Sequence, residues 1–269
     1  MSWGAWGRHF NSIDMQRQIE STVGLGISTF DHADIYGGYT TESVFGAAFS
    51  KTNISRSSIQ LISKCGIQLQ TPNRSNRLKH YDCSKNYIIS SAEASLKHLK
   101  TAYLDLLLIH RPSPLMDPHD IMEAVQHLKK EGKIINFGVS NFTPSQVELL
   151  SSEVAVAVNQ IEFSLVQHQA LFDGTLDQLI TQKITPMAWA PLGGVFSAEN
   201  TVQNARILEA LEALSPRYNA RPDQLLLAWI LKHPSGIHPV IGSTNLERIK
   251  AASKAVSITL SNEDWFKLL

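Results

Sequence analysis

Short apolar segments alternate with helix-forming segments along this chain, and this alternation constrains its fold more than any other feature. Neighbouring parallel strands require crossover connections of this kind, so the pattern predicts an all-parallel α/β sheet. The predicted strands cover residues 26–30, 59–64, 104–110, 134–139, 154–161, 184–189 and 239–242. The main predicted helices cover residues 15–25, 41–49, 84–100, 117–131, 169–182, 203–214 and 222–232.

The N-terminus bears on whether this sheet can close into a barrel. A (β/α)8 TIM barrel needs an eighth strand before Met15, and residues 1–10 are too short and too aromatic to supply a full one. Two explanations stay open: a truncated strand at Met1, Ser2 and Trp3, or a start that lies downstream of the real one, which we favour. Either way, Trp3 and Trp6 are expected to be partly exposed. With no linker and no short repeat, residues 1–269 are predicted to form a single α/β domain, a TIM barrel with a truncated first strand.

The charge balance narrows the choice of partners. Lys and Arg together number 24, as do Asp and Glu, so no basic field attracts nucleic acid or anionic lipid. No apolar run is long enough to span a bilayer. Cys65 and Cys83 are too few for a disulfide framework, and neither they nor the histidines have metal-ligand spacing. We therefore expect a cytoplasmic protein that acts on small molecules, without a metal, a nucleic acid or a membrane.

Polar side chains follow three of the predicted strands. Asp31, Asp34 and Tyr36 follow the first strand in a loop closed by two glycines, Lys64 ends the second and His110 ends the third. The C-terminal ends of parallel strands are where α/β enzymes place their catalytic residues. The sequence therefore predicts that these side chains meet at one edge of the sheet.

This set of residues suits proton transfer to a carbonyl oxygen. A tyrosine with its ordinary pKa near 10 is a poor acid at neutral pH, and a nearby ammonium stabilises the phenolate. Tyr36 would then be the proton donor or acceptor, Lys64 would tune it and Asp31 would hold Lys64 in place. His110 would hydrogen-bond the substrate oxygen. Each of these residues alone could instead be a structural ion pair or a satisfied polar group.

Several other residues have two interpretations. His32 alternates away from Asp31 and is interpreted as a histidine that packs in the core or supports the catalytic residues, in preference to one that takes part in the reaction. Cys65 is interpreted as a buried, inert thiol in preference to a redox-sensitive one. The loop aromatics could cover the rim of the barrel or line an apolar substrate pocket; they are Trp3, Trp6, Tyr39 and Tyr81.

Residues 31–37, Asp-His-Ala-Asp-Ile-Tyr-Gly, resemble the D-x-A-x-x-Y-G signature of the aldo/keto reductase superfamily. The resemblance extends in family order over about residues 24–255 and is greatest to bacterial oxidoreductases of that superfamily. The segments that carry it are residues 62–64, 108–112, 138–142, 159–162, 189–194 and 241–249.

The resemblance implies a (β/α)8 barrel that transfers a hydride between NADP(H) and a carbonyl. It implies four catalytic residues: Asp31, Tyr36, Lys64 and His110. It also implies cofactor-binding residues, which are Ser140, Asn141 and Gln160 for the carboxamide, Trp189 with the adjoining Ala190 for the nicotinamide face, Leu192, Gly193 and Gly194 for the pyrophosphate, and Gly242, Ser243, Thr244 and Arg248 for the adenosine 2′-phosphate. A guanidinium pairs bidentately with phosphate. Gly242 replaces a lysine of many relatives, which weakens the expected preference for NADP.

We therefore predict an NADPH-dependent reductase of aldehydes or ketones, with Tyr36 as the general acid. Two alternatives remain. In the first, Lys64 forms a Schiff base, as in barrel aldolases. In the second, the protein binds NADPH as a sensor or regulatory subunit and has little turnover.

Overall fold

The computed structural model describes residues 3–197 and 201–269. The chain is divided into two compact units, the first ending at Val158 and the second starting at Asn159. Among the described residues, no helix has both the length and the apolar character needed to cross a membrane. A single domain over residues 1–269 stays a prediction.

The first unit is built on four parallel strands, in which β1 pairs with β2, β2 with β5, and β5 with β6. These strands are β1 (Thr29–Asp31), β2 (Gln60–Cys65), β5 (Leu104–Ile109) and β6 (Ile134–Ser140). Its helical segments are α1 (Ser12–Gly24), α2 (Tyr36–Tyr39), α3 (Thr41–Phe49), η1 (Arg56–Ser58), α4 (Lys85–Leu99), α5 (Pro118–Lys130) and α6 (Pro144–Ser151). The first four predicted strands exist and are parallel, but the first covers Thr29–Asp31 and not residues 26–30, because Gly26 lies in the turn that ends α1.

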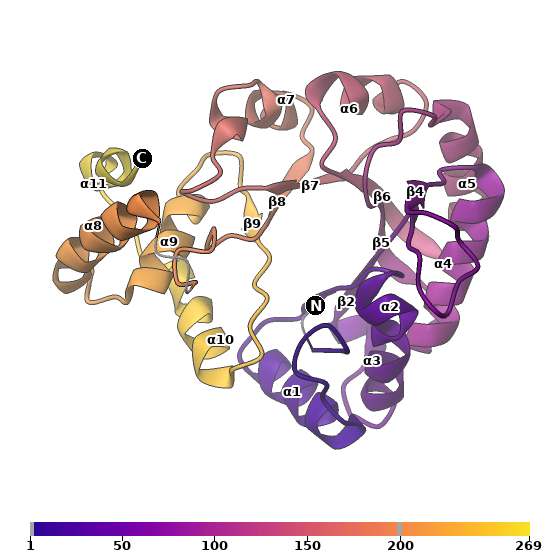
Figure 1. The fold of residues 1–269 in the computed structure, drawn as a ribbon, viewed down its shortest axis with the longest axis horizontal. Helices are drawn as coiled ribbons and strands as arrows, with labels where there is room; N and C mark the ends of the chain where they lie inside the picture. Colours follow the sequence, from indigo (N-terminus) through magenta and orange to yellow (C-terminus); the bar gives the residue numbers. More distant parts are fainter. Residues whose placement is uncertain (1–2, 198–200) are drawn as a thin grey trace. The chain divides into compact units, whose positions relative to one another are not determined.

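Helix α4 shows how the helices of this unit are held against the sheet. Its buried stripe contains Ile88, Ala92, Leu96 and Leu99, at the spacing of one helical face. The helix ends where Lys100 adopts the left-handed conformation, with φ of 54°. Figure 1 shows α3, α4 and α5 on one side of strands β2, β5 and β6. This packing keeps the strands in register and their C-terminal ends side by side.

Residues 3–10 form turns that contain no strand. Met1 and Ser2, which belong to the predicted truncated strand, lie outside the described residues. Trp3 is only 5% exposed, because its ring packs edge-on against Phe30 of β1 and also contacts Phe10. The expectation that Trp3 is partly exposed is therefore wrong. Trp6 is 58% exposed, as expected.

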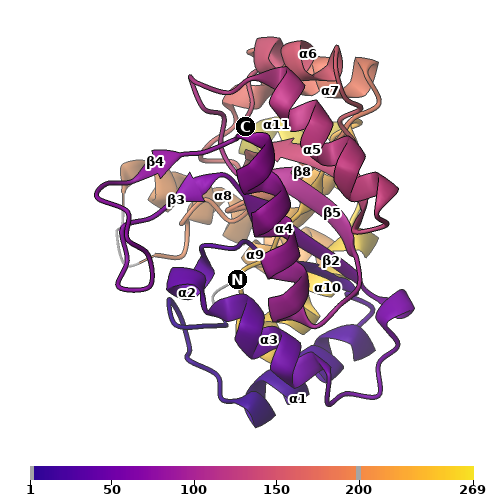
Figure 2. The ribbon, with the colours of Figure 1, turned by 90° about the vertical axis from the view of Figure 1, so that its right-hand side faces the viewer.

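A two-stranded antiparallel hairpin follows β2, and the sequence does not predict it. It consists of β3 (Ile67–Gln68) and β4 (His80–Tyr81), paired as Ile67 with Tyr81 and Gln68 with His80. Strands of two residues are too short to show any periodicity. Figure 2 shows this hairpin apart from strands β2 and β5.

The second unit contains the remaining three strands, in the order β7, β8 and β9. They are β7 (Val158–Glu162), β8 (Thr185–Trp189) and β9 (His238–Pro239). Its helical segments are η2 (Gln169–Leu171), α7 (Thr175–Thr181), α8 (Val202–Tyr218), α9 (Pro222–Leu231), α10 (Leu246–Ser253), η3 (Lys254–Ser257) and α11 (Asn262–Leu268).

Three predicted elements are shorter or divided. The strand predicted over residues 154–161 begins only at Val158, as β7. The helix predicted over residues 169–182 is divided into η2 and α7, because Gly174 has φ of 84° and interrupts it. The strand predicted over residues 239–242 is reduced to β9, after which only Val240 continues the pairing, by donating to the Ala188 carbonyl at 2.8 Å. Gly242 and its neighbours therefore lie in a loop.

Two tryptophans fix the last helix of the second unit. The rings of Trp229 (α9) and Trp265 (α11) are stacked, with centroids 5.0 Å apart and planes 5° apart. Each indole N–H donates to the main-chain carbonyl of the other residue, at 3.2 Å from Trp229 and 2.9 Å from Trp265. Stacking and reciprocal hydrogen bonds together hold α11 on α9.

Candidate active site

Hydrogen bonds beyond the ends of three strands bring the predicted catalytic residues together. Asp31 is the last residue of β1, Lys64 lies one residue before the end of β2, and His110 directly follows β5. The His110 N–H donates to the Cys65 carbonyl at 2.8 Å. The Asp34 N–H donates to the Lys64 carbonyl at 3.0 Å, so the loop after β1 also stays against β2.

The Lys64 ammonium is at the centre of this group. Its side chain has no exposed surface, and its Nζ lies 2.7 Å from Asp31 Oδ2, 2.8 Å from the His32 carbonyl oxygen and 3.3 Å from the Tyr36 hydroxyl. An ammonium has three N–H donors, and these three oxygens use all of them. The predicted contacts of Lys64 with Asp31 and Tyr36 are thus present.

The charge state of Lys64 follows from these partners. Burial lowers the pKa of its ammonium, but the Asp31 carboxylate and the Tyr36 hydroxyl outweigh burial and raise that pKa above its ordinary value. A lysine that forms a Schiff base must first lose its proton. A fully hydrogen-bonded ammonium with a raised pKa therefore argues against the aldolase alternative.

Two glycines turn the chain at Tyr36. Gly37 and Gly38 have φ of 63° and 66°, a conformation that other residues rarely adopt. A side chain on Gly37 would also place its Cβ 2.5 Å from Thr41 Oγ1. The Tyr36 ring lies edge-on to His110, with centroids 5.9 Å apart, and edge-on to Trp6, at 6.4 Å. The phenol is thus held between the Lys64 ammonium and an imidazole.

His110 is held as a neutral imidazole. Burial, followed by the charges of Lys64 and Arg111, lowers the pKa of His110 to about 2. Its Nδ1 is buried and has no hydrogen-bond partner among the described residues, so Nε2 is the ring nitrogen left for a substrate. A neutral imidazole can hydrogen-bond a carbonyl oxygen without giving up a proton at physiological pH.

A second polar group lies on the other side of β2, and sequence reasoning missed it. Asp34 Oδ2 accepts hydrogen bonds from the hydroxyls of Tyr87, at 3.1 Å, and Ser91, at 3.0 Å, both on α4. Glu42 of α3 is also buried and accepts from the Ser63 hydroxyl at 2.6 Å. Burial and then the nearby Glu42 charge raise the pKa of Asp34 to about 7. We call this set, Asp34, Glu42, Ser63, Tyr87 and Ser91, the helix-side layer.

The β3–β4 hairpin is attached to the loop that carries Tyr36. Ile67 packs against Ala33 and Ile35, with Tyr39 and Tyr81 partly buried against them. The Tyr39 hydroxyl accepts from the Leu69 N–H at 3.0 Å and donates to the Ile67 carbonyl at 3.4 Å. Tyr39 and Tyr81 thus hold the hairpin on the catalytic loop, which favours a rim-covering role for both.

His32 is a packed histidine, as predicted. Its side chain is fully buried, its ring lies 4.4 Å from that of Phe45, and burial lowers its pKa well below the ordinary value. Cys65 is also buried, and burial raises the pKa of its thiol, which fits the predicted inert role. The described residues contain no group of three His, Cys, Asp or Glu side chains that could hold a metal.

Two predicted cofactor residues lie in the first unit, at the end of β6. Ser140 is buried and accepts a hydrogen bond from the Asn141 side-chain amide at 2.7 Å. Asn141 has φ of 60°, a left-handed conformation that asparagine adopts more readily than most residues. The two side chains are therefore held together where the chain leaves the strand. Their contact with a nicotinamide stays a prediction.

The other predicted cofactor residues lie in the second unit, at or after its strands. Gln160 is buried in β7, and Trp189 ends β8. Consecutive turns follow in residues 190–197, with positive φ at Ala190, Gly193 and Gly194. Only glycine suits position 193, because a Cβ there would lie 2.7 Å from Ser164 Oγ.

The predicted phosphate residues lie at the N-terminus of α10. Ser243 Oγ accepts from the Asn245 N–H at 3.1 Å, and the Asn245 side chain caps α10 by accepting from the Glu247 and Arg248 N–H groups. Arg248 is exposed in the first turn and forms no ion pair with a carboxylate of the described residues. Open space surrounds the position of a Cβ on Gly242. An unpaired guanidinium beside hydroxyls and open backbone fits a phosphate group.

Comparison with known proteins agrees with this architecture. A sequence profile of the Aldo/keto reductase family matches residues 1–268. The chain is 44% identical to "Uncharacterized oxidoreductase YcsN" of Bacillus subtilis over 97% of its own length and 88% of that protein. It is 39% identical to "6-dehydroglucose reductase" of Agrobacterium fabrum, over 94% and 86% of the two chains. The solved structure of the thermostable aldo-keto reductase Tm1743, in complex with an inhibitor, matches with a TM-score of 0.84 and 25% identity, over 99% of this chain and 92% of that one.

These matches and the strand-end residues define an α/β oxidoreductase with the TIM-barrel fold class that the sequence predicts. The chain belongs to the aldo/keto reductase family and is an oxidoreductase of that family.

Proposed function

We propose that this protein reduces the carbonyl group of a small aldehyde or ketone to an alcohol, using NADPH. The observation that carries the proposal is the hydrogen-bonded set of Asp31, Lys64 and Tyr36 beside a neutral His110. The 6-dehydroglucose reductase of Agrobacterium fabrum, which is 39% identical, bears a name that describes a carbonyl reduction.

The residues divide the work as their contacts indicate. NADPH, when bound, supplies the hydride for the carbonyl carbon. Tyr36 donates its hydroxyl proton to the carbonyl oxygen, and Lys64 stabilises the phenolate that remains because its ammonium already contacts the phenol oxygen. Asp31 keeps Lys64 charged and in place. His110 orients the carbonyl oxygen through Nε2.

Binding of the cofactor is proposed to use residues at the ends of β6, β7 and β8 and at the start of α10. Ser140, Asn141 and Gln160 would hold the carboxamide, and Trp189 would cover the nicotinamide face. Gly193 and Gly194 would allow the pyrophosphate to approach the backbone closely. Arg248 would pair with the 2′-phosphate, which distinguishes NADPH from NADH.

The central test is NADPH oxidation, followed by the loss of absorbance at 340 nm, with a panel of aldehydes and ketones. Alcohol formation in equal amount to NADPH consumed supports the proposal. Tight NADPH binding with negligible turnover over the whole panel contradicts it and favours the sensor alternative. Trapping of an aldehyde on Lys64 by borohydride without nicotinamide favours the aldolase alternative.

Arg248→Ala tests the cofactor assignment. A charge-assisted hydrogen bond to phosphate is worth roughly 1.5–3 kcal/mol, so NADPH binding should weaken by that amount and NADH binding should change little. Arg221→Ala is a matched control, because that arginine pairs with Asp223 at 2.9 Å on the same unit. Equal weakening for both cofactors would show that Arg248 does not bind the phosphate.

A further inference from the structure

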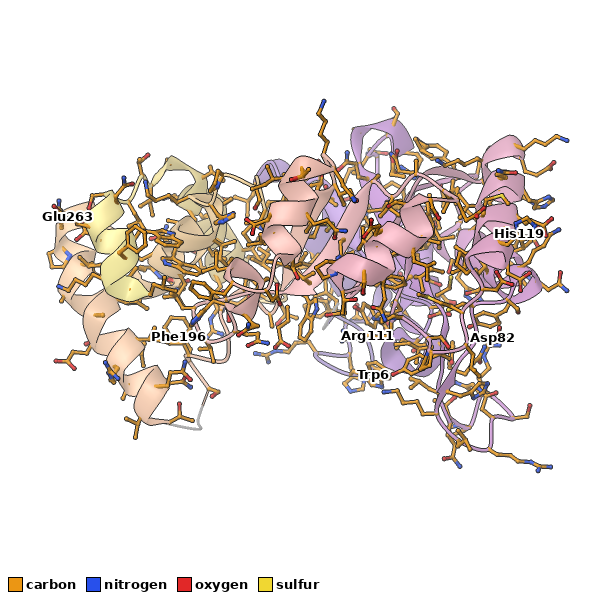
Figure 3. The ribbon with its side chains drawn as sticks, turned by 90° about the horizontal axis from the view of Figure 1, so that it is seen from above. Trp6, Asp82, Arg111, His119, Phe196 and Glu263 are labelled. Carbon is orange, nitrogen blue, oxygen red and sulfur yellow. The ribbon has the colours of Figure 1, made fainter. Side chains whose placement is uncertain are left out.

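The loops next to the predicted catalytic residues in the first unit have a strongly one-sided charge. Segments 3–10, 69–81 and 110–116 contain no Asp or Glu, and the acids that follow directly are Asp82 and Asp117. Their cations are Arg8, Arg74, Arg77, Lys79 and Arg111. The whole chain has equal numbers of basic and acidic residues, 24 of each, so this excess is local. Figure 3 shows Trp6, Arg111 and Asp82, the residue after β4, toward the same side of the ribbon.

Three of these cations lie in the segment between β3 and β4, which is fixed to the catalytic loop. The Asn73 side-chain amide donates to the Gly38 carbonyl at 3.1 Å, two residues from Tyr36. The Arg74 guanidinium lies 4.3 Å above the centre of the Tyr39 ring. The Asn76 side-chain amide donates to Gln68 Oε1 at 3.1 Å and to the Leu69 carbonyl at 3.0 Å. The cations therefore sit on a braced segment.

Arg77 and Lys79 of this segment are exposed, as is Arg8 of residues 3–10, and none of the three forms an ion pair with a carboxylate of the described residues. Half-buried lysines elsewhere have such partners, as in Lys85 with Glu123 and Lys133 with Glu93, whereas the exposed Lys129 and Lys130 form no ion pair with a carboxylate of the described residues either. Clustered charges of one sign beside a low-dielectric wall attract ions of the opposite sign and raise their local concentration.

The field of these cations reaches the catalytic group. Lys79 and Arg111 are among the charges that, after burial, lower the pKa of His110. Lys64 contributes a further positive charge, although Asp31 compensates it at 2.7 Å. The segment that carries Arg77 and Lys79 is also attached, through Asn73 and the Gly38 carbonyl, to the loop that carries Tyr36.

We infer that the preferred substrate is an aldehyde or ketone that also carries an anionic group, such as a carboxylate, phosphate or sulfonate, held by the cations of segment 69–81. The inference rests on the carbonyl reduction proposed above and adds the chemical class of the substrate. Arg77 and Lys79 are the residues that determine this preference, because they are exposed and unpaired.

Two aldehydes that differ by one charge provide the test. 4-Carboxybenzaldehyde is an anion at neutral pH, and its methyl ester, methyl 4-formylbenzoate, is neutral with the same ring and the same reacting group. At saturating NADPH and low salt, kcat/KM for the acid should exceed that for the ester by about tenfold, as expected for two charges at mid-range distance. Raising the ionic strength to about 0.5 M should bring the ratio close to one.

Matched double variants identify the residues. In Arg77→Gln/Lys79→Gln the ratio of the two kcat/KM values should fall at least about fivefold. Lys129→Gln/Lys130→Gln removes two exposed charges from the last turn of α5, which points away from the C-terminal ends of the strands, and should keep the ratio of the parent protein.

Each outcome of this experiment is informative. Equal kcat/KM for acid and ester in the parent protein would overturn the inference and leave carbonyl reduction standing. Reduction of neither aldehyde, nor of any other in the panel, would overturn carbonyl reduction itself and the inference with it. If Arg77→Gln/Lys79→Gln raises only the KM for NADPH, the cations serve the cofactor and the inference is wrong.

Discussion

The two sides of strand β2 hold buried carboxyl groups in different ways. On the catalytic side, Asp31 has the Lys64 ammonium at 2.7 Å. On the helix side, Asp34 Oδ2 accepts hydrogen bonds from the hydroxyls of Tyr87 and Ser91, and the hydrogen-bond partners of Asp34 among the described residues include no cation. The two carboxyls are three residues apart, so a short loop supplies both environments.

The difference lies in the partners of the two groups. The Lys64 ammonium beside Asp31 has a raised pKa and stays charged at physiological pH. Asp34 has no cation among its hydrogen-bond partners in the described residues, and burial and then the adjoining Glu42 charge raise its pKa. The helix-side layer contains an acid with a pKa of about 7, which is half protonated near neutrality.

Removing the cation from the catalytic side should have the largest effect. Lys64→Met leaves Asp31 without its ammonium, and breaking a buried ion pair in this way costs about 3–5 kcal/mol of folding stability. Carbonyl reduction should fall at least about 10²-fold. Adding Asp31→Asn should restore much of the stability and none of the activity. Thermal melting and NADPH oxidation measure the two effects, and a single variant that melts like the parent would remove the contrast between the sides.

Removing the charge of Asp34 from the helix side should raise the folding stability, whereas Lys64→Met lowers it. The folded state raises the pKa of Asp34 from 3.8 to about 7, so the stability that this group contributes is fully present below pH 3.8 and is lost as pH rises to about 7. Asp34→Asn does not ionise. It should be more stable than the parent at pH 8, by at most about 4 kcal/mol, with the difference vanishing near pH 4.

Melting temperatures from pH 4 to pH 8 check this prediction, and Glu42→Gln refines it. Because Glu42 repels the Asp34 charge, Glu42→Gln should reduce the pH dependence of the melting temperature without abolishing it. A parent protein whose stability relative to Asp34→Asn is constant over this range would show that Asp34 stays ionised.

Each side of β2 has one tyrosine hydroxyl that a substitution by phenylalanine removes. Tyr36→Phe should lower kcat/KM for a carbonyl at least about 10²-fold, because the transferable proton is lost, and leave NADPH binding intact. Tyr87→Phe removes one hydrogen bond to Asp34 and should cost about 1 kcal/mol of stability, with activity within about threefold of the parent. Similar losses of activity in the two variants would mean that the helix-side layer takes part in the reaction.

The smallest effect on the melting temperature is expected for a surface ion pair with the same N–O distance as the pair of Lys64 and Asp31. Lys133 Nζ lies 2.7 Å from Glu93 Oε1, as Lys64 Nζ does from Asp31 Oδ2, but the side chains of Lys133 and Glu93 are 28% and 47% exposed. Water already solvates these charges, so the attraction gained is small. Lys133→Met should leave the melting temperature unchanged within error. A shift comparable to that of Lys64→Met would show that distance, and not burial, sets the effect.

The sequence predicted the catalytic side well for a physical reason. Asp31, Lys64 and His110 are polar residues directly at the ends of apolar strands, a contrast that is visible within a few positions. Parallel pairing then brings strand ends together wherever the strands lie in the chain. The same argument predicted the order and direction of the strands, although it placed the start of β1 too early and overestimated the lengths of β7 and β9.

The helix-side layer was not predictable in this way. Tyr87 lies 53 residues from Asp34, and on a helix with an ordinary apolar stripe two hydroxyls carry no signal of their own. The burial of Trp3 depends on contacts with Phe10 and Phe30, which composition does not reveal. The β3–β4 hairpin consists of two-residue strands, and its attachment to Tyr39 is a tertiary contact.

The stacked Trp229 and Trp265 of the second unit make tryptophan fluorescence sensitive to the position of α11. Trp229 is fully buried, and Trp265 depends on α11 remaining in place for its contact with Trp229. An indole that passes from a protein interior to water emits at longer wavelength. Release of α11 would therefore redshift tryptophan emission even while the first unit stays folded. Fluorescence and 340 nm absorbance could then follow, in one cuvette, the integrity of the C-terminal helix and the turnover of NADPH.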